Sequence, residues 1–107
     1  MEILKNQEAL QEAVRTHRLV IVQFGAGHCA PCRALQNRIQ SWNRSHPEVC
    51  HLYVDVADFP ETCAQMGVFT VPAVFIYAEG KLTVQQSGYF SLDQMLQQAE
   101  KYRRLLE

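Results

Sequence analysis

Apolar residues in this chain follow two spacings, and each spacing predicts one kind of secondary structure. Apolar runs over 19–24, interrupted only by Gln23, and over 73–77 have the length of buried strands, and a looser alternation over 49–56 indicates a third strand. The more polar stretch 82–86 and the short pair 3–4 are typical of edge strands. The hydrophobic pattern therefore predicts four to five strands.

Four further segments repeat their apolar residues with the period of an α-helix. One of these segments carries Leu35, Ile39 and Trp42 on one face. We expect this helix over about 31–45. It should end there because His46 precedes a proline, and a residue before proline avoids helical geometry. The other three helices are expected to begin at capping residues or an early proline, namely at Asn6, at Asp58 or Phe59, and at Ser91.

The order of these elements predicts an α/β fold. Strands and helices alternate until the last two strands, which a tight turn at Glu79-Gly80 joins as a hairpin. This order gives a central mixed β-sheet of four to five strands flanked by about four helices, on both faces. The length suits a single domain spanning 1–107.

Composition and charge exclude several classes of function. The net charge is −1, with acids and bases interspersed, so we expect no nucleic-acid or membrane surface. No apolar run approaches the length of a membrane span. The first residues lack the basic and apolar regions of a signal peptide, which predicts a cytoplasmic protein.

The candidate chemistry is a pair of cysteines separated by two residues, in Cys29-Ala30-Pro31-Cys32. The pair lies where the 19–24 strand turns into the long helix. At the start of a helix, free backbone N–H groups and the positive end of the dipole favour a thiolate at Cys29. Cys32 follows about one turn later, close enough to close a disulfide. The spacing predicts a dithiol that cycles between reduced and oxidised forms.

These segments resemble the thioredoxin family over nearly the whole chain. The Cys-Ala-Pro-Cys segment resembles the family's active site, and the segment 69–77 resembles the stretch in which a cis-proline, here Pro72, faces the dithiol. The resemblance implies the thioredoxin fold and an extended substrate that pairs with the backbone of Val71. It implies a substrate surface formed by His28, Ala30, Pro31, Val71, Pro72, Gly88 and Tyr89.

Two roles are expected for the cysteines. Cys29 is predicted to be the nucleophile, and Cys32 the thiol that resolves the mixed disulfide. The alternatives are a metal site and a structural cystine. A zinc site needs four ligands, and no second CxxC or CxxH motif is present, so no metal is expected. Cys50 and Cys63 belong to no motif and are expected to pack as small apolar residues.

Three positions depart from the family pattern. Gln23 stands where thioredoxins usually carry a buried aspartate that helps to deprotonate the resolving cysteine, and glutamine offers hydrogen bonds only. Tyr53 stands where many bacterial relatives have a lysine near that aspartate. Gly25 and His28 replace aromatic residues, which predicts less aromatic surface around the dithiol. A protonated His28 would favour the Cys29 thiolate; the alternative is an exposed loop histidine without a role.

The predicted function is that of a thiol–disulfide oxidoreductase that reduces, or exchanges with, protein disulfides. Its expected partners are protein disulfide substrates and a thioredoxin-reductase-like flavoenzyme. The chain itself is expected to be a monomer that binds no cofactor. Two alternatives remain open: a more oxidising disulfide oxidase or isomerase, and a redox-inert thioredoxin-fold binding module.

Overall fold

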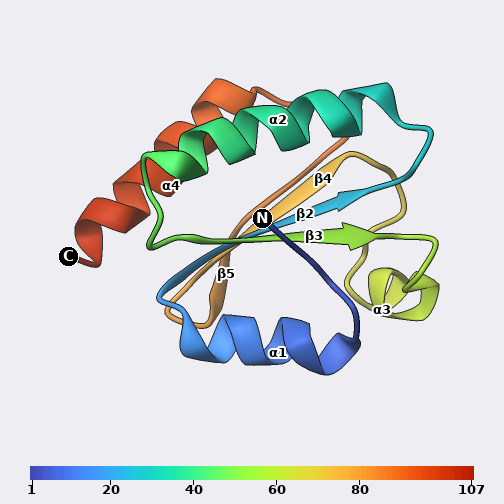
Figure 1. Cartoon of the computed structure of the whole chain (residues 1–107), viewed down its shortest axis with the longest axis horizontal. Helices are drawn as coiled ribbons and strands as arrows, with labels where there is room; N and C mark the ends of the chain where they lie inside the picture. Colours follow the sequence, from blue (N-terminus) through green and yellow to red (C-terminus); the bar gives the residue numbers. More distant parts are fainter.

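A computed structural model describes the whole chain, residues 1–107, as five strands and four helices (Figure 1). The elements follow one another as β1 (Glu2–Ile3), α1 (Gln7–Thr16), β2 (Leu19–Gly25), α2 (Ala30–Arg44), β3 (Cys50–Asp55), α3 (Pro60–Gln65), β4 (Ala73–Ala78), β5 (Lys81–Ser87) and α4 (Leu92–Leu105).

All five strands form one mixed sheet in the order β1-β3-β2-β4-β5. β3 pairs in parallel with β1 and with β2, whereas β4 pairs antiparallel with β2 and β5. In this register Gln23 of β2 lies opposite Tyr53 of β3 and Val74 of β4. The central strand β2 is buried along its whole length, as its apolar run predicts.

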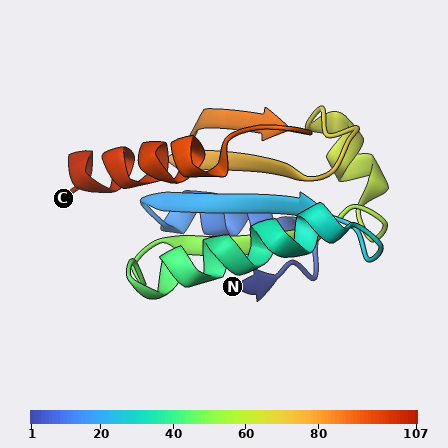
Figure 2. The same ribbon diagram turned by 90° about the horizontal axis from the view of Figure 1, so that it is seen from above.

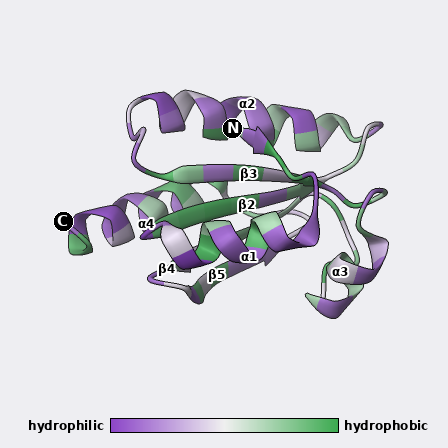
Figure 3. Cartoon of the chain, turned by 60° about the horizontal axis from the view of Figure 1, so that its bottom comes forward, coloured by the Kyte–Doolittle hydropathy of each residue, from purple (hydrophilic) through white to green (hydrophobic).

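Helices cover both faces of the sheet, α2 and α4 on one and α1 and α3 on the other (Figure 1). Seen from above, α2 and α4 lie over the same face, with β2 between them (Figure 2). Alternate side chains of β2 belong to the cores on opposite faces of the sheet. Val20 and Val22 pack in the core under α1 and α3, and Ile21 packs in the core under α2 and α4. Hydrophilic and hydrophobic residues alternate along the helices, whereas the central strand β2 is hydrophobic over most of its length (Figure 3).

Capping side chains begin two of the helices where the sequence predicts. The Asn6 side chain accepts a hydrogen bond from the Ala9 amide at the start of α1. Ser91 Oγ does the same for the Gln94 amide at the start of α4. α3 begins with Pro60 in its first turn, and its preceding residue Phe59 makes no side-chain cap.

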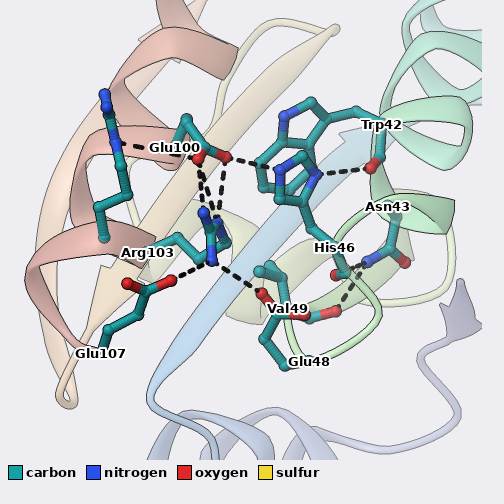
Figure 4. A network of polar contacts seen from close by, with 9 residues as sticks. Trp42, Asn43, His46, Glu48, Val49, Glu100, Arg103 and Glu107 are labelled. Carbon is teal, nitrogen blue, oxygen red and sulfur yellow. Dashed lines mark hydrogen bonds and ion pairs between the residues drawn. The ribbon is translucent and has the colours of Figure 1, made fainter.

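A polar network joins the C-terminal ends of α2 and α4 (Figure 4). His46, just after α2, contacts Glu100 of α4, which also accepts hydrogen bonds from Arg103. The His46 ring stacks on the indole of Trp42, with 4.1 Å between ring centroids. These contacts hold together the two helices that cover one face of the sheet.

The predicted architecture is confirmed, namely a mixed sheet with four helices on its two faces. The element bounds differ from the predicted ones by one or two residues. The long helix runs over Ala30–Arg44 and the first strand over Glu2–Ile3, so Leu4 lies just after that strand and is buried.

Candidate active site

The cysteine pair lies at the carboxyl end of β2, where the chain enters α2. Cys29 is the N-cap residue of α2, and its sulfur accepts a hydrogen bond from the Cys32 backbone amide at 3.1 Å. Pro31 lies in the first turn, where a missing N–H leaves no intrahelical bond unmade. Because Cys29 is the N-cap, the free backbone N–H groups at the start of α2 point toward its sulfur.

Cys29 and Cys32 form a disulfide in this structure, with 5.2 Å between their Cα atoms. The two sulfurs differ in exposure: Cys29 is half-buried, whereas Cys32 is 1% exposed. Once the bond is reduced, the helix start favours the thiolate of Cys29. The arrangement therefore offers one accessible, activated sulfur and one enclosed sulfur within bonding distance of it.

The peptide bond between Val71 and Pro72 is cis, which confirms the isomer that the sequence predicts. The Gly88 amide donates a hydrogen bond to the Pro72 carbonyl at 2.9 Å, so the loops before β4 and after β5 are held together. Gly88 has φ of 72°, a conformation that glycine adopts without a steric penalty.

A shallow groove of about 300 Å³ runs between the first turn of α2 and the loop after β5. It is lined by Pro31, Ala34, Leu35, Arg38, Pro72, Gly88, Tyr89, Phe90 and Leu92. Four predicted substrate residues, Pro31, Pro72, Gly88 and Tyr89, therefore lie around one groove. Three others, His28, Ala30 and Val71, do not line it; His28 and Ala30 are exposed and Val71 is half-buried.

Two further residues, one in the groove and one in the loop that leads to the cis-proline, were not predicted from the sequence as site residues. Arg38 lines the groove from α2 and pairs with Asp93 of α4 at 2.6 Å. Phe69, three residues before the cis-proline, is 79% exposed. The sequence did contain an indication that Phe69 could be a site residue. It is an apolar residue that fits no strand or helix period, and it lies within the segment 69–77 that resembles a functional motif.

Beneath the dithiol lies Gln23, a residue of β2 with no exposed surface. Its Nε2 donates a hydrogen bond to the Cys32 backbone carbonyl at 2.7 Å. Its Oε1 is buried and has no hydrogen-bond partner. Gln23 therefore touches the residue that carries the enclosed sulfur and brings no ionisable group to it.

The ring of Tyr53 fills the space beside Gly25. A Cβ atom added to Gly25 would lie 2.9 Å from Tyr53 Cζ and closer still to the hydroxyl oxygen. Burial, with a further contribution from Asp55, raises the pKa of the Tyr53 hydroxyl, so the ring is neutral. β3 thus supplies a ring beside Gly25, where β2 lacks one, and the smaller aromatic surface around the dithiol stays a prediction.

The two remaining cysteines are unpaired and buried in the core under α1 and α3. Burial raises the pKa of the Cys50 thiol to about 11 and also raises that of Cys63. Both are therefore poor nucleophiles at neutral pH. No group of three or more His, Cys, Asp or Glu side chains is placed to hold a metal ion.

Comparison with known proteins agrees with this geometry. The profile of the Thioredoxin family matches residues 2–101. The chain is 30% identical to thioredoxin-2 of Pyricularia oryzae over 73% of its length, but this match spans 46% of that relative. It is 30% identical to thioredoxin of Mus musculus, over 82% of this chain and 86% of that one.

Solved structures of thioredoxins have the same fold. A point-mutant thioredoxin from Halobacterium salinarum matches with a TM-score of 0.85 and 21% identity, over 94% of this chain and 88% of that chain. Fasciola hepatica thioredoxin matches with a TM-score of 0.84 and 25% identity, over 95% of this chain and 99% of that chain.

Fold and cysteine pair define the class of a thiol–disulfide oxidoreductase with a helix-capping dithiol. The chain belongs to the thioredoxin family. No helix in the structure combines the length and the apolar composition that crossing a lipid bilayer requires.

Proposed function

We propose that this protein reduces, or exchanges with, disulfides of protein substrates, with Cys29 as the attacking thiolate and Cys32 as the resolving thiol. One observation carries the assignment of roles. Cys29 caps α2, accepts the Cys32 amide and is partly accessible, whereas Cys32 is 1% exposed. An activated, accessible thiolate attacks, and an enclosed neighbour acts only on a bond already made to Cys29.

The exchange takes place in two steps. In the first, the Cys29 thiolate attacks one sulfur of the substrate disulfide; a mixed disulfide forms and the other substrate sulfur leaves as a thiolate. In the second, Cys32 loses its proton and attacks the Cys29 sulfur. The Cys29–Cys32 bond then forms, and the second substrate thiolate leaves. Two electrons have passed from the protein to the substrate.

The groove beside the dithiol is the proposed substrate surface. An extended substrate segment would pair with the backbone of Val71, next to Pro72, and lie against Gly88 and Tyr89. His28, Ala30 and Pro31 would form the rim on the side of the cysteines. The apolar lining and the exposed rings of Tyr89 and Phe69 favour substrates with aromatic or aliphatic residues beside the disulfide.

The proposed partner for regeneration is a flavoenzyme of the thioredoxin-reductase type, whose dithiol would reduce the Cys29–Cys32 bond. The domain would need no cofactor of its own. We place the protein in the cytoplasm, a reducing compartment that suits two unpaired cysteines. Its exposed large apolar side chains belong to several different elements rather than to one contiguous patch of the kind that forms a subunit interface. This distribution favours a monomer.

Reduction of insulin disulfides by dithiothreitol, followed by turbidity, tests the function. The wild type is expected to accelerate the reaction, and Cys29→Ser to abolish the acceleration. Cys32→Ser is expected to accumulate a mixed disulfide, visible by mass spectrometry. Cys63→Ser is the matched control, a buried thiol outside the site, and should keep wild-type activity. No acceleration by the wild type would favour the binding-module alternative.

A second candidate, a more oxidising oxidase or isomerase, has one supporting observation: Gln23 brings no carboxylate beneath the dithiol. Titration of the Cys29–Cys32 pair against glutathione separates the two. A reductase stays oxidised under glutathione concentrations that reduce an oxidase.

A further inference from the structure

We infer that the side-chain carbonyl of Gln23 accepts the hydrogen of the reduced Cys32 thiol, so that reduction of the dithiol adds a buried hydrogen bond. The inference rests on the redox cycling of Cys29 and Cys32 proposed above. It makes Gln23 a positioning residue that sets the balance between the dithiol and the disulfide.

The orientation of the Gln23 amide follows from its contact with Cys32. Nε2 lies 2.7 Å from the Cys32 carbonyl oxygen and donates to it. The flipped amide would bring two acceptors together at that distance, which is repulsive. Oε1 is therefore the free end of the amide. It is buried and has no partner, an arrangement that carries an energetic penalty in a folded protein.

The missing donor appears when the disulfide is reduced. In the disulfide, the Cys32 sulfur carries no hydrogen. Reduction creates an S–H group on a residue that is 1% exposed and that the Gln23 amide already touches. The oxidised protein thus has a buried acceptor without a donor, and the reduced protein gains a buried donor on the residue that the same amide already contacts.

Other groups near this site do not take the same role. The Tyr53 hydroxyl, on the strand opposite Gln23, makes no hydrogen bond to Oε1 and lies over Gly25 instead. The Cys29 thiolate is a competing acceptor for the Cys32 proton. It already receives the Cys32 backbone N–H and faces the start of α2. Gln23 Oε1 has no such alternative.

The consequence is a shift of the redox equilibrium. When two glutathione thiols reduce the pair, the Cys29–Cys32 bond breaks and a glutathione disulfide forms. Two electrons pass to the two cysteine sulfurs; one proton stays on Cys32, and the other is released to solvent when Cys29 ionises. The bond from Nε2 to the Cys32 carbonyl does not require the sulfur, so it largely cancels between the two states. The bond to Oε1 exists only after reduction and stabilises the dithiol. Because an amide does not ionise, this contribution does not vary with pH near neutrality.

Replacement of the amide by an apolar side chain of similar size tests the inference. For Gln23→Met we expect the equilibrium constant for reduction by glutathione to fall about fivefold, by the loss of one weak hydrogen bond. A fivefold change corresponds to about 20 mV toward a more negative potential. The shift should be the same on both sides of neutral pH. Gln23→Leu is the second variant, should the first fail to fold.

His51→Leu is the matched control. His51 is 2% exposed, and neither of its ring nitrogens has a hydrogen-bond partner. It lies on the same face of β3 as Tyr53. In the strand register, however, it is opposite Ile21, two residues before Gln23 and farther from the cysteines. Its replacement should leave the glutathione equilibrium unchanged. An equal shift in this control would show that any buried polar residue has the effect, and would overturn the inference.

The S–H stretching vibration of Cys32 supplies a second measurement, assigned as the infrared band of the reduced protein that Cys32→Ala removes. A thiol that donates a hydrogen bond absorbs at lower frequency than a free thiol. The band should move to higher frequency in Gln23→Met. An unmoved band, or an unchanged glutathione equilibrium, overturns the inference while insulin reduction by the wild type still stands. Failure of insulin reduction alone counts against the proposed function and leaves these two readouts intact.

Discussion

His46 Nε2 lies 2.6 Å from a carboxylate oxygen of Glu100, while the other ring nitrogen lies 2.9 Å from the Trp42 carbonyl (Figure 4). Both ring nitrogens of His46 therefore face acceptor oxygens, and the ring also stacks on the Trp42 indole. This contact ties the end of α2, the helix of the dithiol, to α4.

Glu100→Gln is expected to destabilise the protein at neutral pH by roughly 1 kcal/mol at most. A hydrogen bond from Arg103 and the nearby charges of His46 and Arg103 lower the pKa of Glu100 below its usual value. The ionised carboxylate therefore stabilises the fold above its unfolded-state pKa, and this contribution is lost as pH falls through the folded-state pKa. Urea unfolding followed by Trp42 fluorescence should show a difference at pH 7 that shrinks as pH falls through the lowered pKa of Glu100.

Glu107→Gln is the control for this prediction. Glu107 also pairs with Arg103, but its side chain is 65% exposed and does not contact His46. Its urea midpoint should stay close to that of the wild type. A difference between wild type and Glu100→Gln that persists undiminished at low pH would contradict the role of the charge.

His51 makes the protein sensitive to mild acid. Burial lowers the pKa of its ring from 6.5 to about 4, so as pH falls the unfolded chain takes up a proton before the folded one does. Stability is therefore lost between pH 6.5 and 4, by about 2 kcal/mol between pH 7 and pH 5. Urea unfolding of His51→Leu should lack this loss. An equal decline in both proteins would place the acid sensitivity elsewhere.

Gly25→Ala is expected to cost about 1–2 kcal/mol in stability, because the new methyl group overlaps the Tyr53 ring. The backbone at this position needs no positive φ, so the close approach is the whole reason for glycine. In a Tyr53→Leu background the same substitution should cost much less. A double-mutant cycle of thermal unfolding measures this coupling; additive effects would remove Tyr53 as the cause.

Gln23→Asp should speed the release of the Cys29–substrate mixed disulfide, since a carboxylate beneath Cys32 can take its proton. The gain should grow with pH, because burial raises the pKa of an aspartate and only the ionised form is a base. Stability should fall, since an ionisable group enters the interior. Single-turnover exchange with a peptide disulfide measures the rate. Equal rates at every pH would show that resolution needs no base at this position.

Phe69→Ala is expected to raise the KM for protein disulfides roughly three- to tenfold with little change in thermal stability. The ring is 79% exposed, so its loss leaves no cavity, and it stands close to the cis-proline in sequence. Ile3→Ala removes another exposed apolar side chain, 60% exposed on β1, and should not change KM. Insulin reduction at varied substrate concentration compares the two. Equal KM values in all three proteins would exclude Phe69 from the substrate surface.

The sequence by itself determined the elements, their order and the cysteine pair. The buried run of β2, the helical period of α2 and the caps Asn6 and Ser91 are local patterns, read over a few residues, and the structure has them where they were predicted. The activation of Cys29 is equally local, because strand, cysteine and helix start follow one another along the chain.

Only the tertiary structure decided which distant side chains meet. Nothing in the sequence brings Tyr53 against Gly25, orients the Gln23 amide toward the Cys32 carbonyl, or pairs His46 with Glu100. Each contact joins two elements whose spacing depends on how the sheet and helices pack, and a shift of about one ångström would change the partner. Hydrogen bonds and close packing are short-ranged, so these relationships exist only once the whole fold has formed.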